Sequence, residues 1–189
     1  MPFRLIVYTF LVLQLSCSNP AEPDRENYIS LDNLESLRVE KENWCTPYDR
    51  SEYSSNRVVE QTIVDRQGGA FSPYDGTCFT SLRQSDIEHI VAVSEAHSSG
   101  MCGRNQEAKK EFAADYLNLT LATPSLNRHQ KIAYDFAEWQ PPQNGCWYAW
   151  RIVEVKKKYN LSVDLAEKNT MRQFLMNCKD VKMKTPSCN

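Results

Sequence analysis

Six cysteines beyond the first eighteen residues restrict the folds that this chain can adopt. They are Cys45, Cys78, Cys102, Cys146, Cys178 and Cys188. An even number of cysteines with no CxxC or CxxH pair is typical of disulfides rather than of a zinc site. Six cysteines allow fifteen pairings, and their spacing does not choose among them. We therefore predict a domain held by up to three disulfides.

An apolar run near the N-terminus indicates export to the oxidising compartment that disulfides require. The run from Leu5 to Leu15 follows Arg4, is too short to span a bilayer and has the length of a signal-peptide core. We assign residues 1–18 to a signal peptide and predict a secreted or periplasmic protein. The alternative is a lipoprotein signal that ends before Cys17 and leaves the chain lipid-anchored.

The remaining chain reads as a polar tether followed by one domain. Residues 19–43 begin with prolines and contain no aromatic cluster, so we place the tether there and the domain at 44–189. The hydrophobic content of the full chain, 41%, suits a single core, and its net charge of −2 gives no general basic surface. We expect a monomer without a transmembrane segment in the mature chain.

The residue pattern predicts an α+β domain. β-branched runs bounded by turn residues favour strands, and Thr123-Pro124 is a typical helix start. The predicted strands are 57–64, 87–93 and 118–122, and the predicted helices are 105–114, 124–139, 147–159 and 164–177. On the helix at 124–139, Asn127 and Lys131 share one face, and His129 falls on the opposite, apolar face.

The stretch DIEH, at 86–89, places two carboxylates and an imidazole at the start of an apolar strand. Together with FAADYLNLTLATPSLNRHQK and EWQPP further along, it resembles the secreted HNH endonucleases related to the C-terminal domain of the GmrSD restriction enzyme. The resemblance covers about residues 48–178 and is most specific over 86–131. It departs from the family pattern at Glu88, where Asp is more usual, and at Ala92, where Pro is common.

The resemblance implies a ββα-metal (HNH, or His-Me finger) core with additional C-terminal helices. Carried over residue by residue, it makes His89 the general base and Glu88 and Asn127 metal ligands. Asn118 is then the asparagine that holds the imidazole or the loop around it, and Asp86 is a further candidate ligand. By the family pattern, the products would carry 5′-phosphate ends.

These residue types also suit phosphodiester hydrolysis on chemical grounds. An imidazole, with an ordinary pKa of about 6.5, can deprotonate water near neutral pH. Carboxylate and amide oxygens are ligands of hard divalent cations, of which Mg²⁺ is our first choice and Mn²⁺ or another ion the alternative. In a regular strand Glu88 and His89 point to opposite faces, so a shared site requires the backbone to turn or bulge there.

We therefore expect an exported, metal-dependent endonuclease that acts on nucleic acid, with DNA preferred. Lys131, Lys156 and Lys157 are the candidate contacts to its backbone. The alternatives are an RNase or nonspecific nuclease, and a secreted binding module that keeps the fold without catalysis.

Overall fold

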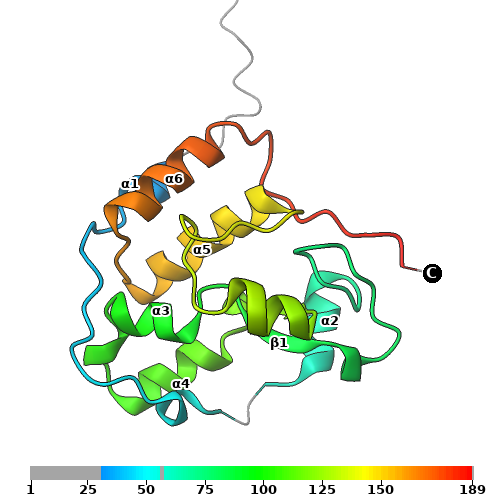
Figure 1. Cartoon of the computed structure of the whole chain (residues 1–189), viewed down its shortest axis with the longest axis horizontal. Coiled ribbons are helices and arrows are strands. Elements are labelled where there is room, and N and C mark those ends of the chain that lie inside the picture. The colour runs from blue at the N-terminus through cyan, green and yellow to red at the C-terminus, as the bar shows by residue number, and fades with distance from the viewer. Residues whose placement is uncertain (1–30, 56–57, 189) are drawn as a thin grey trace, which may run out of the picture.

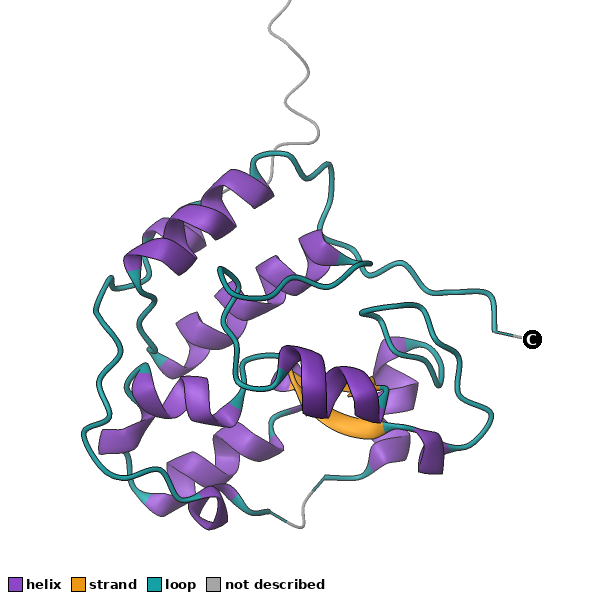
Figure 2. Cartoon of the chain, viewed as in Figure 1, coloured by secondary structure: helices purple, strands orange, loops and turns teal. Residues whose placement is uncertain are grey.

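Helices and loops surround a small sheet in the computed structural model, which describes residues 31–55 and 58–188 (Figures 1 and 2). The α-helices are α1 (Asp32–Glu35), α2 (Glu60–Gln67), α3 (Val93–Ser98), α4 (Gln106–Ala114), α5 (Gly145–Tyr159) and α6 (Leu165–Leu175). Short 3-10 helices are η2 (Arg50–Tyr53), η3 (Leu82–Gln84), η4 (Met101–Gly103) and η5 (Tyr116–Asn118), and η6 (Leu126–Lys131) is a π-helix. The predicted signal peptide and residues 19–30 of the predicted tether lie outside the described residues.

The sheet pairs β1 (Asp86–His89) with β2 (Leu119–Ala122) in antiparallel orientation. Asp86 lies opposite Ala122 and His89 opposite Leu119, so the register is continuous and contains no bulge. The helices α3 and α4 occupy the connection between the two strands. Directly after β2 the chain forms η6, which crosses in front of β1 in the view of Figure 2. The predicted mixture of helices and antiparallel strands is therefore confirmed.

The strand predicted for residues 57–64 is wrong, because helix α2 spans Glu60–Gln67. Ile63 and Gln67 are one turn apart and both are buried, and Ile63 packs against Leu119 and Leu121 of β2. The helical period buries these residues against the sheet, so tertiary packing overrides the strand preference of the β-branched side chains. The helix ends at Gly68, whose φ of 84° is a left-handed cap that glycine adopts readily.

The two apolar segments on either side of the site are both shorter than predicted. The strand expected at 87–93 ends at His89, and α3 already begins at Val93. The helix expected at 124–139 ends at Lys131, because the φ of Ile132 is 49°, which lies outside the right-handed helical region. The π-helical hydrogen bond from Ile132 N to Asn127 O measures 3.2 Å.

That π-helix also changes which side chains face inward. His129, predicted on the apolar face, is exposed, whereas the side chain of Lys131 is completely buried. The helical wheel used for the prediction assumes 100° steps, and the wider π-helical turn shifts the residues around the axis.

The remaining helices are confirmed, and they build most of the core. Helix α5 buries Tyr148, Ile152 and Val153 completely or almost so. Helix α6 begins directly after Asp164, the first residue of the predicted range, whose Oδ1 accepts a hydrogen bond of 2.7 Å from Glu167 N. Leu34 and Leu37 also belong to this core. The assignment of Leu34 and Leu37 to a tether is therefore wrong, because both residues pack in the core of the domain.

Three disulfides join distant parts of the domain, as predicted. They are Cys45–Cys102, Cys78–Cys188 and Cys146–Cys178, with sequence separations of 57, 110 and 32 residues. Among the residues that the structure describes, no helix has the length and apolar character needed to cross a membrane.

Candidate active site

A cavity of about 250 Å³ lies where β1 ends. Glu88, His89 and Asn127 all contribute to its wall, together with Tyr48 and Arg50 from the N-terminal part of the domain. His89 is the last residue of β1, so the cavity lies at the end of the strand. There it can be lined both by Glu88, from one face of the strand, and by His89, from the other. The turn that a shared site requires therefore follows the strand, and no bulge is needed within it.

His89 is oriented by a backbone carbonyl. Its Nε2 lies 2.9 Å from Ala113 O of α4, and since a carbonyl can only accept, Nε2 carries the proton. Nδ1 is then the nitrogen with a free lone pair. Burial lowers the pKa of His89 to about 4, with Arg50 and Lys131 adding to the shift and the Ala113 carbonyl opposing it. The ring is therefore neutral at neutral pH, and it is a weaker base than the ordinary imidazole assumed from the sequence.

Glu88 forms a buried ion pair with Lys131 of η6. Only 4% of Glu88 is exposed, and Lys131 Nζ lies 2.7 Å from its Oε1 and donates a 2.9 Å hydrogen bond to His89 O. Burial raises the pKa of Glu88, and the Lys131 ammonium opposes that shift. The expected role of Lys131 as a nucleic-acid contact is wrong for this conformation, because its ammonium is enclosed and links η6 to the end of β1.

Asp86 lies at the other end of β1 and is held by two residues of η6. Arg128 donates to both carboxylate oxygens, at 2.7 Å through Nε and 2.6 Å through Nη2, and lowers the pKa of the carboxyl group. Asn127 Nδ2 donates to Asp86 Oδ2 at 3.1 Å. This hydrogen bond fixes the amide of Asn127 and leaves its Oδ1 as the atom that could bind a cation.

Asn118 holds the turn after β1 rather than the imidazole. Its fully buried side chain accepts from Val91 N at 2.7 Å and donates to Val91 O at 3.1 Å, and its own carbonyl accepts from Ile90 N at 2.9 Å. The sequence left open whether Asn118 holds the imidazole or the loop around it. In the structure its side chain holds the loop, through both hydrogen bonds to Val91.

Replacing Asn118 with alanine is expected to destabilise the protein by about 1–3 kcal/mol, because both polar groups of Val91 would be buried without partners. Urea unfolding followed by circular dichroism measures this change. The matched control is Asn169→Ala at an exposed position of α6, where we expect a change within about 0.5 kcal/mol. Equal effects of the two substitutions would contradict the role of Asn118 in the turn.

The cavity includes two residues that the sequence reasoning missed, Tyr48 and Arg50. Among the described residues, no carboxylate lies within ion-pair distance of Arg50, so its positive charge is available to an anion in the cavity. The only local signal is an aromatic and a basic residue two positions apart, which is too common to single out. Their approach to His89 is a product of the tertiary fold.

The two neighbouring lysines on α5 have different environments. Lys156 is completely buried, with Nζ at 2.7 Å from Glu95 Oε1 and 2.5 Å from Glu167 Oε2. Its predicted contact with nucleic acid is therefore wrong. Lys157 is exposed and donates to Asn33 Oδ1, and its contact with a substrate stays a prediction.

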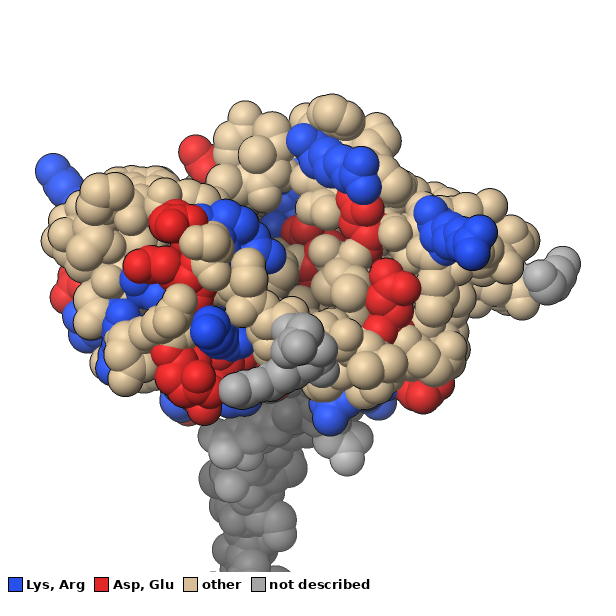
Figure 3. All heavy atoms as spheres, turned by 90° about the horizontal axis from the view of Figure 1, so that it is seen from below, with Lys and Arg blue, Asp and Glu red and all other residues tan. Residues whose placement is uncertain are grey.

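Surface charge does not gather into one broad basic region on the face shown in Figure 3. Basic and acidic side chains are interspersed across it. This face therefore provides no general basic field that would attract a polyanion.

Within residues 31–55 and 58–188, no group of three or more His, Cys, Asp or Glu side chains is arranged to hold a metal ion. A metal in the cavity would therefore depend on few protein ligands, one of them an amide oxygen. Magnesium is commonly bound by one or two carboxylates and several waters, so such a sparse set is compatible with it.

Comparison with known proteins gives two findings. The family described as GmrSD restriction endonucleases, C-terminal domain, matches residues 17–174. A protein of Arthroderma benhamiae named "Uncharacterized secreted protein" is 33% identical over 127 residues, which cover 66% of this chain and 62% of that relative. No solved structure matches.

Proposed function

This chain belongs to the family of GmrSD restriction endonuclease C-terminal domains, and from that membership we propose that it is an exported, HNH-type endonuclease that hydrolyses DNA. One observation carries the proposal. His89, neutral and with Nδ1 unprotonated, lines the same cavity as Glu88 and Asn127. The chain order of two antiparallel strands followed by a helix, β1, β2 and η6, supports a ββα-metal core in which η6 would be the helix.

In this mechanism His89 acts as the general base. A water molecule in the cavity donates a proton to Nδ1 as its oxygen bonds to the phosphorus. The bond between phosphorus and O3′ breaks in the same step, and the leaving 3′ oxygen takes a proton from solvent. The hydrogen bond from Nε2 to Ala113 O keeps the ring in the tautomer and orientation that this step needs, and it stabilises the imidazolium that forms. Asn118 maintains the turn that follows His89, and so acts as a positioning residue.

The donor atoms around the cavity fit a divalent cation. Glu88 Oε1 is buried and, among the described residues, accepts no hydrogen bond of acceptable geometry although Lys131 Nζ is near, so the carboxylate keeps lone pairs for another cation. Glu88 and Asn127 Oδ1 would hold the ion, and Asp86 would orient Asn127. When bound, Mg²⁺ stabilises negative charge on the phosphoryl and leaving oxygens.

Arg50 is our candidate for holding the scissile phosphate. It lines the cavity, and its guanidinium is close enough to His89 to lower the pKa of that residue. A planar guanidinium can bind two phosphate oxygens at once, which would fix the phosphorus relative to the attacking water.

Export is supported by two observations. Three disulfides are typical of proteins that fold in an oxidising compartment, and the relative from Arthroderma benhamiae is named a secreted protein. We propose the same destination for this chain, with residues 1–18 as its signal peptide.

Chelation by EDTA is expected to abolish cleavage of plasmid DNA by the mature protein, and excess Mg²⁺ is expected to restore it. The fold should survive the chelator, because three disulfides hold it and no structural metal cluster is present among the described residues. Circular dichroism and the melting temperature in EDTA provide that control. Cleavage that continues at full rate in EDTA would contradict the metal-dependent mechanism.

The same assay separates the alternatives. An RNase or nonspecific nuclease would degrade RNA with the same metal dependence. A binding module without catalysis would cleave neither substrate, yet would still retain DNA in a mobility-shift experiment.

A further inference from the structure

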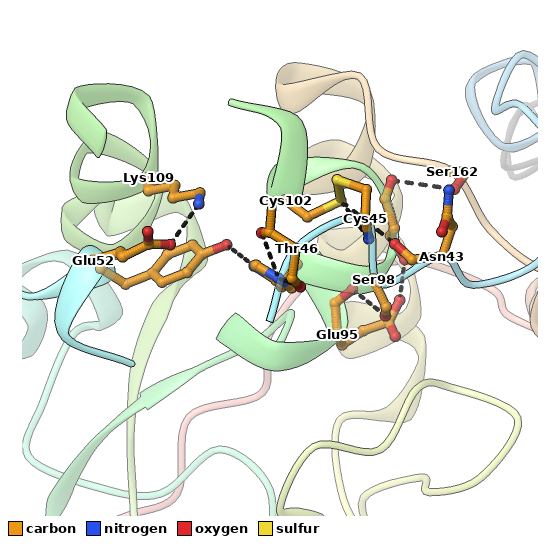
Figure 4. The surroundings of a disulfide bond; sticks show 12 residues. Asn43, Cys45, Thr46, Glu52, Glu95, Ser98, Cys102, Lys109 and Ser162 are labelled. Atoms are coloured by element: carbon orange, nitrogen blue, oxygen red, sulfur yellow. Dashed lines mark hydrogen bonds and ion pairs between the residues drawn. A yellow bond between two sulfur atoms is a disulfide. The ribbon is translucent and has the colours of Figure 1, made fainter. Parts of the chain in front are cut away.

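The segment 43–53, which we call the strap, carries Tyr48 and Arg50 to the cavity and is fastened to the connection between β1 and β2 (Figure 4). Asn43 N donates to Ser98 O at 2.9 Å, and Cys45 forms a disulfide with Cys102. The strap is therefore fixed to α3 and η4 at its first residues.

A buried histidine and an ion pair fix the middle and the end of the strap. His97 Nε2 lies 2.9 Å from Thr46 O and therefore carries the proton, so its Nδ1 accepts from the Tyr53 hydroxyl at 2.8 Å. Lys109 of α4 donates to Glu52 at 2.5 Å. These contacts, drawn in Figure 4, determine where the aromatic residues of the strap lie relative to the active site.

An aromatic pair on the strap extends from the cavity to the surface. The rings of Trp44 and Tyr48 meet edge to face with centroids 6.1 Å apart, and Tyr48 lines the cavity. Trp44 does not line the cavity itself, but it is 52% exposed, so about half of a large apolar side chain faces solvent next to a residue that does. The buried half of the indole packs on Tyr48 and on His97, whose ring centroid lies 5.6 Å away, and the other half is left without a partner among the described residues.

We propose that Trp44 and Tyr48 form a stacking subsite for an unpaired nucleobase next to the scissile phosphate. Aromatic rings bind single-stranded nucleic acid by stacking on base faces, which a duplex keeps covered by its own neighbouring bases. Arg50, on the same strap and in the same cavity, supplies the adjoining cation for the phosphate. The subsite therefore makes the enzyme prefer single-stranded or frayed DNA over intact duplex.

This inference rests on the proposed function for its choice of ligand, and binding can be measured without cleavage. The probe is a short, fluorescein-labelled single-stranded DNA, compared with an abasic strand of the same length and with a duplex. Full-length mature protein carrying His89→Ala is titrated in each case, and fluorescence anisotropy gives the dissociation constant. The wild-type protein is assayed for cleavage in parallel.

The strand with bases is expected to bind about 5- to 150-fold more tightly than the abasic strand, the range that one stacked base provides. Adding Trp44→Ala should remove this preference, and Trp44→Phe should keep most of it. Leu165→Ala, at an exposed apolar position on α6, is the control and should leave the preference unchanged.

If the His89→Ala protein with Trp44 intact binds abasic and ordinary strands with equal affinity, the stacking subsite is overturned. Equal weakening of both strands by Trp44→Ala would also overturn it, because a general loss of structure would explain that result. Either outcome with intact cleavage by the wild type leaves the nuclease function in place. Base-dependent binding without any cleavage would instead reject the nuclease and retain the subsite.

Discussion

Replacing His89 with alanine is expected to lower the rate of DNA cleavage by about 10²- to 10⁴-fold, the usual contribution of a general base. The structure gives the reason, because the Nε2 contact with Ala113 leaves Nδ1 to receive the proton from water. Nicking of supercoiled plasmid in Mg²⁺, followed on agarose gels at several enzyme concentrations, measures the change.

The matched control is His129→Ala. His129 is exposed on η6 and does not line the cavity, although it is close in sequence to Asn127. Its replacement should therefore leave the rate within about twofold of wild type if His89 alone is the base. Added imidazole should restore part of the activity of His89→Ala, since a small base can enter the vacated cavity; a purely structural role would not give this rescue. A His89→Ala protein that is folded and fully active would rule out the mechanism.

The sequence predicted which residues of the motif would lie together better than it predicted the elements that carry them. DIEH and the asparagines at 118 and 127 were found from the motif, and the fold brings Glu88, His89 and Asn127 to one cavity. Tyr48 and Arg50 could not be found in this way. They reach the cavity through contacts such as Cys45–Cys102, which the cysteine spacing does not reveal.

Segment 57–64 shows why local preference failed for the elements. Its β-branched residues favour a strand, but whether they form one depends on the surface they cover. Here Ile63 and Gln67, one helical turn apart, are buried, and Ile63 packs on β2. The segment therefore becomes a helix rather than a strand because of residues far along the chain. Helices α4, α5 and α6 were predictable because their periodicity agrees with their packing, and α4 and α6 also begin at side-chain caps, Asn105 and Asp164.

The lysines were misassigned for a related reason. A lysine-rich stretch reads as a solvated surface, and only the fold reveals a buried carboxylate partner. Lys131 meets Glu88, and Lys156 meets Glu95, 61 residues away, and Glu167, 11 residues away. A charged side chain can be buried when such partners are present. Because the partners are set by the fold, the residues next to a lysine in the sequence do not show whether it is buried.

Replacing Lys156 with methionine is expected to destabilise the protein by about 3–5 kcal/mol, because the buried Glu95 carboxylate would lose its cation and the buried Glu167 carboxyl group its hydrogen-bond donor. Glu95 and Glu167 are 6% and 1% exposed, so water cannot replace the ammonium. Urea unfolding of the purified, oxidised protein measures the change. Lys157→Met, at the adjacent exposed position, is the matched control and should change stability by no more than about 0.5 kcal/mol.

The pH dependence of the Lys156→Met protein tests the same cause. Burial already raises the pKa of Glu167 to about 8 while Lys156 opposes the shift, so removing Lys156 raises it further. A carboxyl group whose pKa is higher in the folded than in the unfolded state takes up protons on folding. The variant should therefore lose stability as the pH rises from about 5 to 8. Adding Glu167→Gln should recover part of the loss, because one buried charge is then removed with its partner. A Lys156→Met protein as stable as wild type throughout this range would show that the buried ion pairs do not support the fold.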